Sequence, residues 1–242
     1  MKQVTLKVIE SVALTSNVYK TVFGGDVSGV TAPGQFVNLR IDGLYLRRPI
    51  SVCDLGENAL TLVYKVVGKG TDALSRAKAG DLFDVLTGLG NGYDLSRAGE
   101  APLLVGGGVG VPPLYYLAKK LIAQGVTPQV VLGFNREEEI FFASEFASLG
   151  AQVTVATVDG SVGVKGFVTD AFPERYSYFY ACGPEPMLKA VWKATTTDGE
   201  LSFEERMGCG FGACMGCSCK TITGYKRICK DGPVLGKGEI LW

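Results

Sequence analysis

The sequence predicts three structural parts: an antiparallel β-barrel over residues 1–98, an open parallel α/β domain over residues 99–199, and a small cysteine-rich segment over residues 200–242. Short alternating strands with glycine-rich turns fill the first part, and strands alternate with helices in the second. In the third part, five of the seven cysteines fall within 21 residues. A chain of 242 residues that is 47% hydrophobic can bury a sizeable core, which excludes wholesale disorder.

The first part contains four clear strand patterns. Apolar and polar residues alternate in them, and turns such as Pro33-Gly34 separate them. Short, closely spaced strands of this kind are typical of an antiparallel barrel or sandwich. The patterns cover residues 4–9, 35–40, 60–67 and 81–86.

The second part begins after Gly99-Glu100-Ala101-Pro102, where the pattern changes. Short apolar runs now alternate with helical stretches, which is the order expected of an open parallel sheet. The predicted strands cover residues 103–105, 130–133, 152–157 and 178–181, and the predicted helices cover residues 113–124, 144–149, 168–172 and 185–195.

The composition excludes several classes of protein. Lys+Arg and Asp+Glu balance at 24 each, so no basic excess points to nucleic acid or to an anionic membrane. The N-terminus lacks the apolar stretch of a secretory signal, and no apolar run approaches the roughly 20 residues that span a bilayer. We therefore expect a cytoplasmic protein. The absence of histidine excludes a Ser-His-Asp triad, a Rieske centre and any His-ligated metal.

The clustered cysteines have the spacing of a metal site. Cys209, Cys214 and Cys217 follow the C-x4-C-x2-C pattern of plant-type ferredoxins, and Cys229 follows after eleven residues. Two irons need four converging thiolates, and the neighbouring glycines allow a tightly wrapped loop. The sequence thus favours a [2Fe-2S] cluster. Zinc is the main alternative, although a second C-x2-C knuckle is missing, and unligated thiols are a third. Cys219 is interpreted as a free thiol.

A glycine-rich turn joins the first strand of the second part to its helix. Residues 106–113 offer backbone N–H groups and a helix N-terminus to a pyrophosphate. The pattern departs from G-x-G-x-x-G because Val111 occupies the last glycine position. A tight turn without a ligand is the alternative interpretation.

Two shorter motifs flank this loop. Cys182-Gly183-Pro184 ends the fourth strand of the α/β part, where ligands of open sheets bind. Taken by itself, however, Cys182 is better explained as a small apolar core residue. In the barrel part, Arg47 and Arg48 precede Pro49-Ile50-Ser51. An arginine can hold a phosphate in a bidentate fork, and a solvated basic turn is the alternative.

The order of these motifs resembles the ferredoxin–NADP reductase superfamily. The tail over residues 205–217, followed by Cys229-Lys230-Asp231-Gly232-Pro233-Val234, is similar to the electron-transfer subunits of dihydroorotate dehydrogenase B. The resemblance covers essentially the whole chain. It implies FAD on the barrel, NAD on the α/β domain and a [2Fe-2S] cluster on the C-terminal segment.

The resemblance also implies roles for individual residues. FAD contacts would come from Arg48, Pro49, Ile50, Ser51, Tyr64, Lys65, Val66, Gly68, Gly70 and Thr71, nucleotide contacts from Gly108, Gly110 and Pro113, a nicotinamide-facing catalytic role from Cys182, and cluster ligands from Cys209, Cys214, Cys217 and Cys229. Many superfamily members have an aromatic residue where this chain has Ile50, so the stacking partner of the flavin stays unassigned. Arg136 and residues 137–139 leave NAD or NADP open, and the resemblance favours NAD.

The function implied is an electron relay. A flavin exchanges electron pairs with a nicotinamide and single electrons with an iron–sulfur cluster. The expected partner is an FMN-containing dihydroorotate dehydrogenase catalytic subunit, in a heterotetramer with two copies of each chain, within pyrimidine biosynthesis. One alternative is a related flavin/iron–sulfur subunit, such as that of an NADH-dependent ferredoxin:NADP oxidoreductase, a sulfite reductase or a hydrogenase. Another is a zinc-stabilised nucleotide-binding regulatory module.

Overall fold

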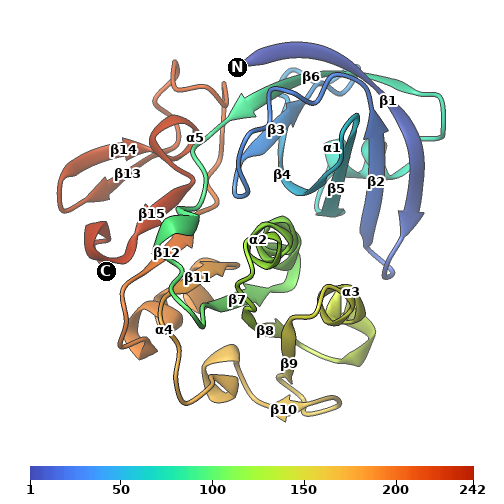
Figure 1. Cartoon of the computed structure of the whole chain (residues 1–242). Coiled ribbons are helices and arrows are strands. Elements are labelled where there is room, and N and C mark those ends of the chain that lie inside the picture. Colours follow the sequence, from blue (N-terminus) through green and yellow to red (C-terminus); the bar gives the residue numbers. More distant parts are fainter.

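The N-terminal part forms a closed antiparallel barrel, as the sequence predicts. The computed structural model describes residues 1–242, and its barrel strands have the order β1-β2-β5-β4-β3-β6 (Figure 1). Because side chains alternate between the two faces of a strand, Leu6 and Val8 are buried while Thr5 and Lys7 are exposed. The strands are β1 (Lys2–Ala13), β2 (Val18–Gly24), β3 (Phe36–Leu39), β4 (Arg48–Leu55), β5 (Ala59–Lys65) and β6 (Leu82–Leu89).

The middle part forms a sheet of the order β10-β9-β8-β7-β11-β12-β15. Neighbouring strands are parallel throughout, except for the antiparallel pair of β12 and β15. This confirms the predicted open α/β architecture. The strands are β7 (Leu103–Gly107), β8 (Gln129–Phe134), β9 (Gln152–Thr157), β10 (Val164–Lys165), β11 (Phe179–Cys182), β12 (Gly199–Ser202) and β15 (Val234–Gly236).

The sheet is wider than the sequence predicts, because β10, β12 and β15 carry no clear strand pattern. Strand β12 spans the expected boundary between residues 199 and 200 and pairs with β11. Strand β15 belongs to the cysteine-rich part of the chain and pairs with β12. The last two parts therefore share one sheet, and the expected division at residue 199 stays a prediction.

Helix α2 (Val111–Ala123) lies between the barrel and the sheet (Figure 1). Two prolines occupy its first turn, where missing N–H groups cost no hydrogen bond. Tyr116 packs into the barrel core, Leu114 and Leu117 pack into the core beside the sheet, and Lys119 Nζ pairs with Asp54 Oδ1 at 2.7 Å. One helix therefore fixes the barrel relative to the sheet.

The remaining helices are short. A one-turn 3-10 helix at Val168–Ala171 stands where the sequence predicts a helix over residues 168–172. None of the helices combines the length and the apolar character that a membrane crossing demands. The others are α1 (Lys69–Ser75), α3 (Ala143–Ser148), α4 (Glu185–Ala194) and α5 (Ile228–Asp231), with 3-10 turns at Leu95–Arg97, Gly108–Gly110, Glu137–Glu139 and Lys237–Glu239.

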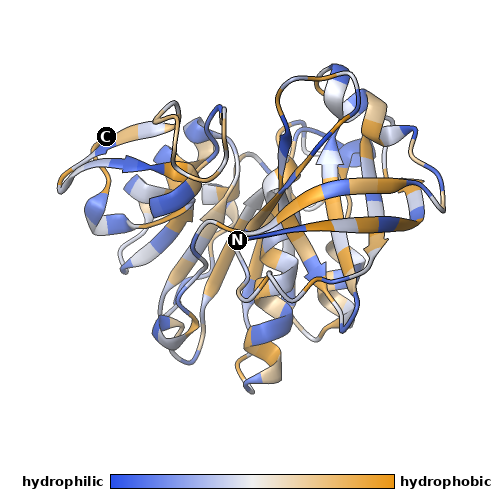
Figure 2. Ribbon diagram, turned by 90° about the horizontal axis from the view of Figure 1, so that it is seen from above, coloured by the Kyte–Doolittle hydropathy of each residue, from blue (hydrophilic) through white to orange (hydrophobic).

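The cysteine-rich segment lies against both the barrel and the sheet. It consists of a hairpin, β13 (Ser218–Thr221) and β14 (Gly224–Arg227), followed by α5 and β15. Figure 2 shows hydrophobic residues gathered on the strands in the middle of the molecule and a largely hydrophilic hairpin near the C-terminus. The side chain of Asn91, just after β6, donates to Val234 O at 2.7 Å and accepts from Val234 N at 3.0 Å. The segment is thus tied to the barrel at Val234, in β15.

A buried carboxyl group lies at the edge of the sheet core. Glu200, in β12, is 9% exposed, and its Oε2 accepts a hydrogen bond from Asp94 N at 2.9 Å. Burial disfavours the charged form, and it raises the pKa of Glu200 to about 7. The fold therefore binds this proton more tightly than the unfolded chain does.

Replacing Glu200 with Gln should remove a pH dependence of stability. Because the pKa in the fold is about 7 and the ordinary value is 4.5, stability is lost as the pH rises between these values. The shift corresponds to about 3 kcal/mol. Urea unfolding should find Glu200→Gln more stable than the parent chain at pH 8 and similar to it near pH 4.5. The exposed Glu57→Gln variant is the control, and parent-like stability of Glu200→Gln at pH 8 would contradict the account.

Candidate functional site

A cavity of about 700 Å³ lies at the predicted nucleotide loop. Its walls come from the barrel, from the glycine-rich turn and from the carboxyl ends of β8 and β11. This is the edge at which open parallel sheets bind ligands. The lining includes Asn17, Lys65, Gly108, Gly110, Asn135, Glu139, Gly183, Pro184, Met187 and Glu204.

Glycine is required at two positions of the turn for different physical reasons. Gly108 has a positive φ of 51°, and a Cβ there would project into open space. A Cβ on Gly110 would lie 2.2 Å from Cys182 O, so only glycine lets α2 approach the end of β11. The main chain from Gly107 to Gly110, just before α2, therefore lines the cavity, where it could contact a pyrophosphate. Pro113 is buried and does not line the cavity.

Cys182 lies beneath the cavity wall. It is 3% exposed, and the neighbouring wall is formed by Gly183 and Pro184. Burial raises the pKa of the Cys182 thiol to about 12, so the group stays protonated at neutral pH. Its position facing a nicotinamide stays a prediction, because Gly183 and Pro184 line the cavity and Cys182 does not.

The predicted flavin motifs lie side by side. A Cβ on Gly70 would be 2.0 Å from Arg48 Nε, so the arginine packs directly on the start of α1. The guanidinium of Arg48 donates only to the carbonyls of Leu46 and Arg47, whereas Arg47 Nη2 pairs with Asp84 Oδ2 at 2.9 Å. Arg48 therefore keeps a charge without a carboxylate partner, which suits a phosphate. The residues present fit the flavin phosphate that the sequence predicts at Arg48 and Gly70.

The other expected flavin residues have mixed placements. Tyr64 points into the barrel, where its hydroxyl lies 3.1 Å from Thr21 Oγ1, so only its main chain can face a ligand. Lys65, one residue later, lines the nucleotide cavity, and Val66 is half-buried. Thr71 Oγ1 accepts from Val67 N at 3.0 Å and holds the turn before α1. The half-buried remainder of the strand motif is Pro49, Ile50 and Ser51, and Gly68 is exposed.

The four predicted cluster cysteines lie in two pairs. Cys209 N donates to Cys214 Sγ and Cys214 N donates to Cys209 Sγ, each over an N–S distance of 3.4 Å. In the second pair, Cys229 N donates to Cys217 Sγ at 3.4 Å. No three of these side chains surround one point as a mononuclear metal ion requires. A two-iron cluster takes two thiolates at each iron, so the residues present fit a [2Fe-2S] cluster.

Main-chain amides favour the thiolate of Cys209. Desolvation raises the pKa of this thiol, but N–H groups of Cys214, Phe211 and Ala213 outweigh it and lower the pKa to about 6. Burial instead raises the pKa of Cys229 to about 12. Cys209 therefore already favours the thiolate form that binds metal. Cys229, in contrast, must release its proton when the metal binds.

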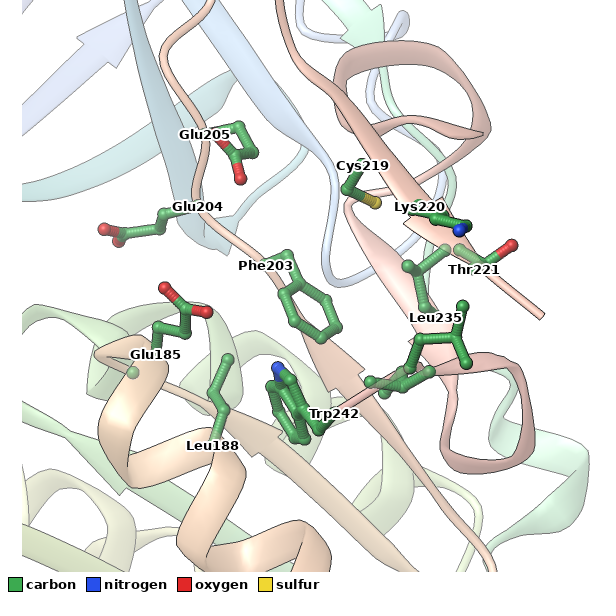
Figure 3. Close-up of a pocket in the computed structure, with 13 residues that line it drawn as sticks. Glu185, Leu188, Phe203, Glu204, Glu205, Cys219, Lys220, Thr221, Leu235 and Trp242 are labelled. Carbon is green, nitrogen blue, oxygen red and sulfur yellow. The ribbon is translucent and has the colours of Figure 1, made fainter. Parts of the chain in front are cut away.

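Cys219 belongs to a different place. It lines a second cavity of about 330 Å³ between α4, the hairpin and the C-terminus. Figure 3 shows its side chain near Lys220, with Phe203 and Trp242 on the opposite wall. The interpretation of Cys219 as a free thiol remains a prediction, and this position supports it.

The end of β8 and the turn that follows it carry polar groups that line the large cavity. Asn135 Nδ2 donates to Glu139 Oε2 at 2.8 Å, and both residues line the large cavity. Arg136 Nε lies 3.5 Å from Glu139 Oε1 and 3.8 Å from Glu138 Oε2. The arginine is therefore occupied by carboxylates, and the cavity presents an acceptor for a hydroxyl group.

Comparison with known proteins identifies the family. The family model of the oxidoreductase NAD-binding domain matches residues 104–193, and that of the iron-sulfur cluster binding domain of dihydroorotate dehydrogenase B matches residues 204–241. The chain is 46% identical over 257 residues to the dihydroorotate dehydrogenase B (NAD(+)) electron transfer subunit of Geobacillus sp., covering 100% of this chain and 99% of that one. The chain belongs to this family. The electron transfer subunit of Fusobacterium nucleatum is 46% identical, covering 97% and 96% of the two chains.

Solved structures agree with this family assignment. The NADH-dependent reduced ferredoxin-NADP oxidoreductase has a TM-score of 0.89 and 33% identity, covering 98% of this electron transfer subunit and 90% of that chain. A ferredoxin NADP+ reductase from Neisseria gonorrhoeae has a TM-score of 0.69 and 17% identity, covering 80% and 90% of the two chains. The second likeness concerns the fold alone.

Sequence reasoning did not predict three residues that shape the site. Asn91 holds the main chain of Val234, and Asn38 holds the main chain of Cys209. Met187 packs on Gly107 and Gly183, where a Cβ would lie 2.4 and 2.5 Å from its side chain. All three act through contacts between distant parts of the electron transfer subunit, and a single sequence carries no local signal for them.

The two cysteines of the C-x-C run should behave differently. Cys217→Ser should lose the cluster, because Cys217 is paired with Cys229 and a hard hydroxyl is a poor iron ligand. Cys219→Ser is the matched control and should keep the iron, the sulfide and the visible spectrum of the parent chain. Loss of the cluster from Cys219→Ser, with retention in Cys217→Ser, would overturn the ligand assignment.

Proposed function

We propose that the chain is the electron-transfer subunit of an NAD-dependent dihydroorotate dehydrogenase. It carries electrons from a catalytic partner to NAD+ through a [2Fe-2S] cluster and FAD. The observation that carries this conclusion is that one barrel supports both a cysteine site and a nucleotide cavity, with the Arg48 strand beside them. An electron carrier needs its sites close together on one rigid support.

The residues of the chain serve this relay by binding and orientation. Arg48 and Gly70 hold a flavin phosphate, and the main chain at Gly108 and Gly110 receives the pyrophosphate of NAD. Two cysteine pairs hold the cluster next to β3, which is paired with the strand that carries Arg48. When bound, FAD supplies the conversion between electron pairs and single electrons.

The oxidation of dihydroorotate is assigned to the partner subunit. This chain has no histidine, and Cys182, the residue expected at the nicotinamide, is buried with a raised pKa. The chain therefore shows no histidine or ionised Cys182 thiolate that could act as a general base in the oxidation of dihydroorotate. We infer that the partner is an FMN-containing catalytic subunit, that two copies of each chain form a heterotetramer, and that the complex works in the cytoplasm. A reducing compartment suits a chain with seven free cysteines.

A related function has one observation in its favour. The NADH-dependent reduced ferredoxin-NADP oxidoreductase matches the chain at 33% identity over almost its whole length. Because the identity to dihydroorotate dehydrogenase B subunits is higher, at 46%, the ferredoxin-NADP oxidoreductase function is only the second candidate. The family assignment disfavours the zinc-stabilised regulatory module, because the matched C-terminal family binds an iron-sulfur cluster.

Reconstitution tests the proposed function directly. The purified chain should oxidise NADH with an artificial acceptor and should not turn over dihydroorotate. Addition of the FMN-containing subunit should create NAD+-linked dihydroorotate oxidation, and Cys217→Ser should abolish the linked activity but keep the activity with the artificial acceptor. Dihydroorotate turnover by the isolated chain, or a chain that couples only to ferredoxin, would contradict the proposal.

The choice of coenzyme should depend on Glu139. Its carboxylate lines the cavity and, with Asn135, offers an acceptor for a ribose hydroxyl. Loss of a charged hydrogen-bond acceptor corresponds to about a tenfold change. We therefore expect Glu139→Gln to lower kcat/KM for NADH by about tenfold relative to NADPH. The exposed Glu137→Gln variant is the matched control, and an unchanged coenzyme ratio in Glu139→Gln would contradict the assignment.

A further inference from the structure

Asn38 is the side chain through which the barrel touches the first cysteine loop. Its Nδ2 donates to Cys209 O at 3.2 Å, although the two residues are 171 positions apart. The residue is 1% exposed and lies in β3. Strand alternation turns Val37 and Leu39 into the barrel interior, so Asn38 faces the outside of the barrel, where the cysteine segment covers it.

The same face of the barrel carries two of the predicted flavin residues of β4, here called the flavin strand, namely Pro49 and Ser51. Arg48 and Ile50 oppose Leu39 and Val37, which face the barrel interior. In the ladder between β3 and β4, Asn38 is paired with Pro49 and Phe36 is paired with Ser51. Directly opposed residues share one face of a sheet, with Cβ atoms about 5 Å apart. Asn38 therefore stands between the predicted flavin strand on one side and the main chain of Cys209 on the other.

The cysteine loop is shaped to receive this amide. Gly210 has a positive φ of 80°, and a Cβ there would lie 2.4 Å from Asn38 Nδ2. Any larger residue would force the loop away from β3. On the same face, Phe36 belongs to the hydrophobic cluster that contains Cys217 and Cys229. Strand β3 thus supports both cysteine pairs.

Stability alone does not explain an asparagine at this position. Asn38 Oδ1 is buried and has no hydrogen-bond partner. An unpaired buried acceptor is unfavourable, and an apolar group of the same shape removes that cost. What an apolar residue cannot supply is the donor that fixes Cys209 O.

We propose that Asn38 is a positioning residue that fixes the Cys209–Cys214 loop against the flavin strand. In this way it sets the environment of the cluster and the electronic coupling between the two cofactor sites. The inference rests on the proposed function, since it assumes that FAD and a cluster occupy these sites. Asn38 acts through the main chain of Cys209, because its amide contacts the carbonyl of that residue.

Substitution of Asn38 in the cluster-loaded chain tests the proposal. Asn38→Leu keeps the side-chain size but removes both the donor and the unpaired oxygen, and Asn38→Asp replaces the donor by a charged acceptor. Thr87→Val is the matched control, because Thr87 Oγ1 is another buried, unpartnered barrel oxygen in β6, opposite Lys2 in the strand ladder. The readouts are melting temperature, FAD, iron and sulfide content, the electron paramagnetic resonance spectrum and the midpoint potential of the cluster.

The proposal predicts a separation between folding and cluster properties. Asn38→Leu should melt at or above the temperature of the parent chain and keep its FAD. It should lose iron to a chelator about fivefold faster, the equivalent of about 1 kcal/mol for one hydrogen bond. Its cluster spectrum should change, and electron transfer from NADH-reduced FAD to the cluster should slow. In Asn38→Asp the added negative charge should lower the midpoint potential. Thr87→Val should change none of the cluster readouts.

Three outcomes would overturn the inference. One is an unchanged spectrum, potential and chelation rate in both Asn38 variants. Another is a fall in melting temperature that removes FAD and cluster together, which would make the role purely structural. The third is an equal cluster effect in Thr87→Val. Gly210→Ala gives an independent check, since it pushes the loop from Asn38 and should change the cluster spectrum in the same direction. These readouts use the isolated chain, so failure of the reconstitution with dihydroorotate would overturn the proposed function and leave this inference standing.

Discussion

The C-terminal segment has no hydrophobic core of its own, and the rest of the arrangement depends on this constraint. Its buried residues Cys217, Ile228 and Cys229 belong to one hydrophobic cluster with Phe36 of the barrel and Leu201 of the sheet. A segment of about 40 residues is below the size at which a chain usually folds without a staple or a partner. The barrel and the sheet therefore dictate the positions of the two cysteine pairs, and the cluster site is built on the same support as the flavin strand.

The charged residues of the barrel have two different roles, because some stabilise the fold and others remain free to bind a ligand. Arg47 and Arg48 are neighbours in sequence, but Arg47 is neutralised by Asp84 within the barrel, while Arg48 has only carbonyl partners. A paired arginine stabilises the strand ends, whereas an unpaired one remains available for a phosphate. The same reasoning applies at the nucleotide cavity. There Arg136 is held by carboxylates and Glu139 keeps one oxygen beside Asn135.

Much of this architecture could be predicted from the sequence, because local patterns carry it. The barrel, the parallel sheet and the spacing of the four cysteines depend on strand alternation, helix alternation and a fixed ligand register. Strands β12 and β15 escaped prediction because pairing, and not local pattern, makes them strands. Asn38 contacts Cys209 across 171 residues, which no local signal reports. Strand alternation could, however, have predicted the orientation of Tyr64, because Tyr64 faces the barrel core and Lys65, the next residue, faces the cavity.

The central claim is that one chain connects a nicotinamide site to a two-iron cluster through a barrel-bound flavin. Anaerobic titration of the purified chain with NADH, followed by electron paramagnetic resonance and by iron and sulfide analysis, tests it most directly. The account predicts about two irons and two sulfides per chain, together with FAD and a cluster signal that NADH alone brings up. Stoichiometric zinc without sulfide, or a cluster that NADH leaves oxidised while the flavin is reduced, would contradict it.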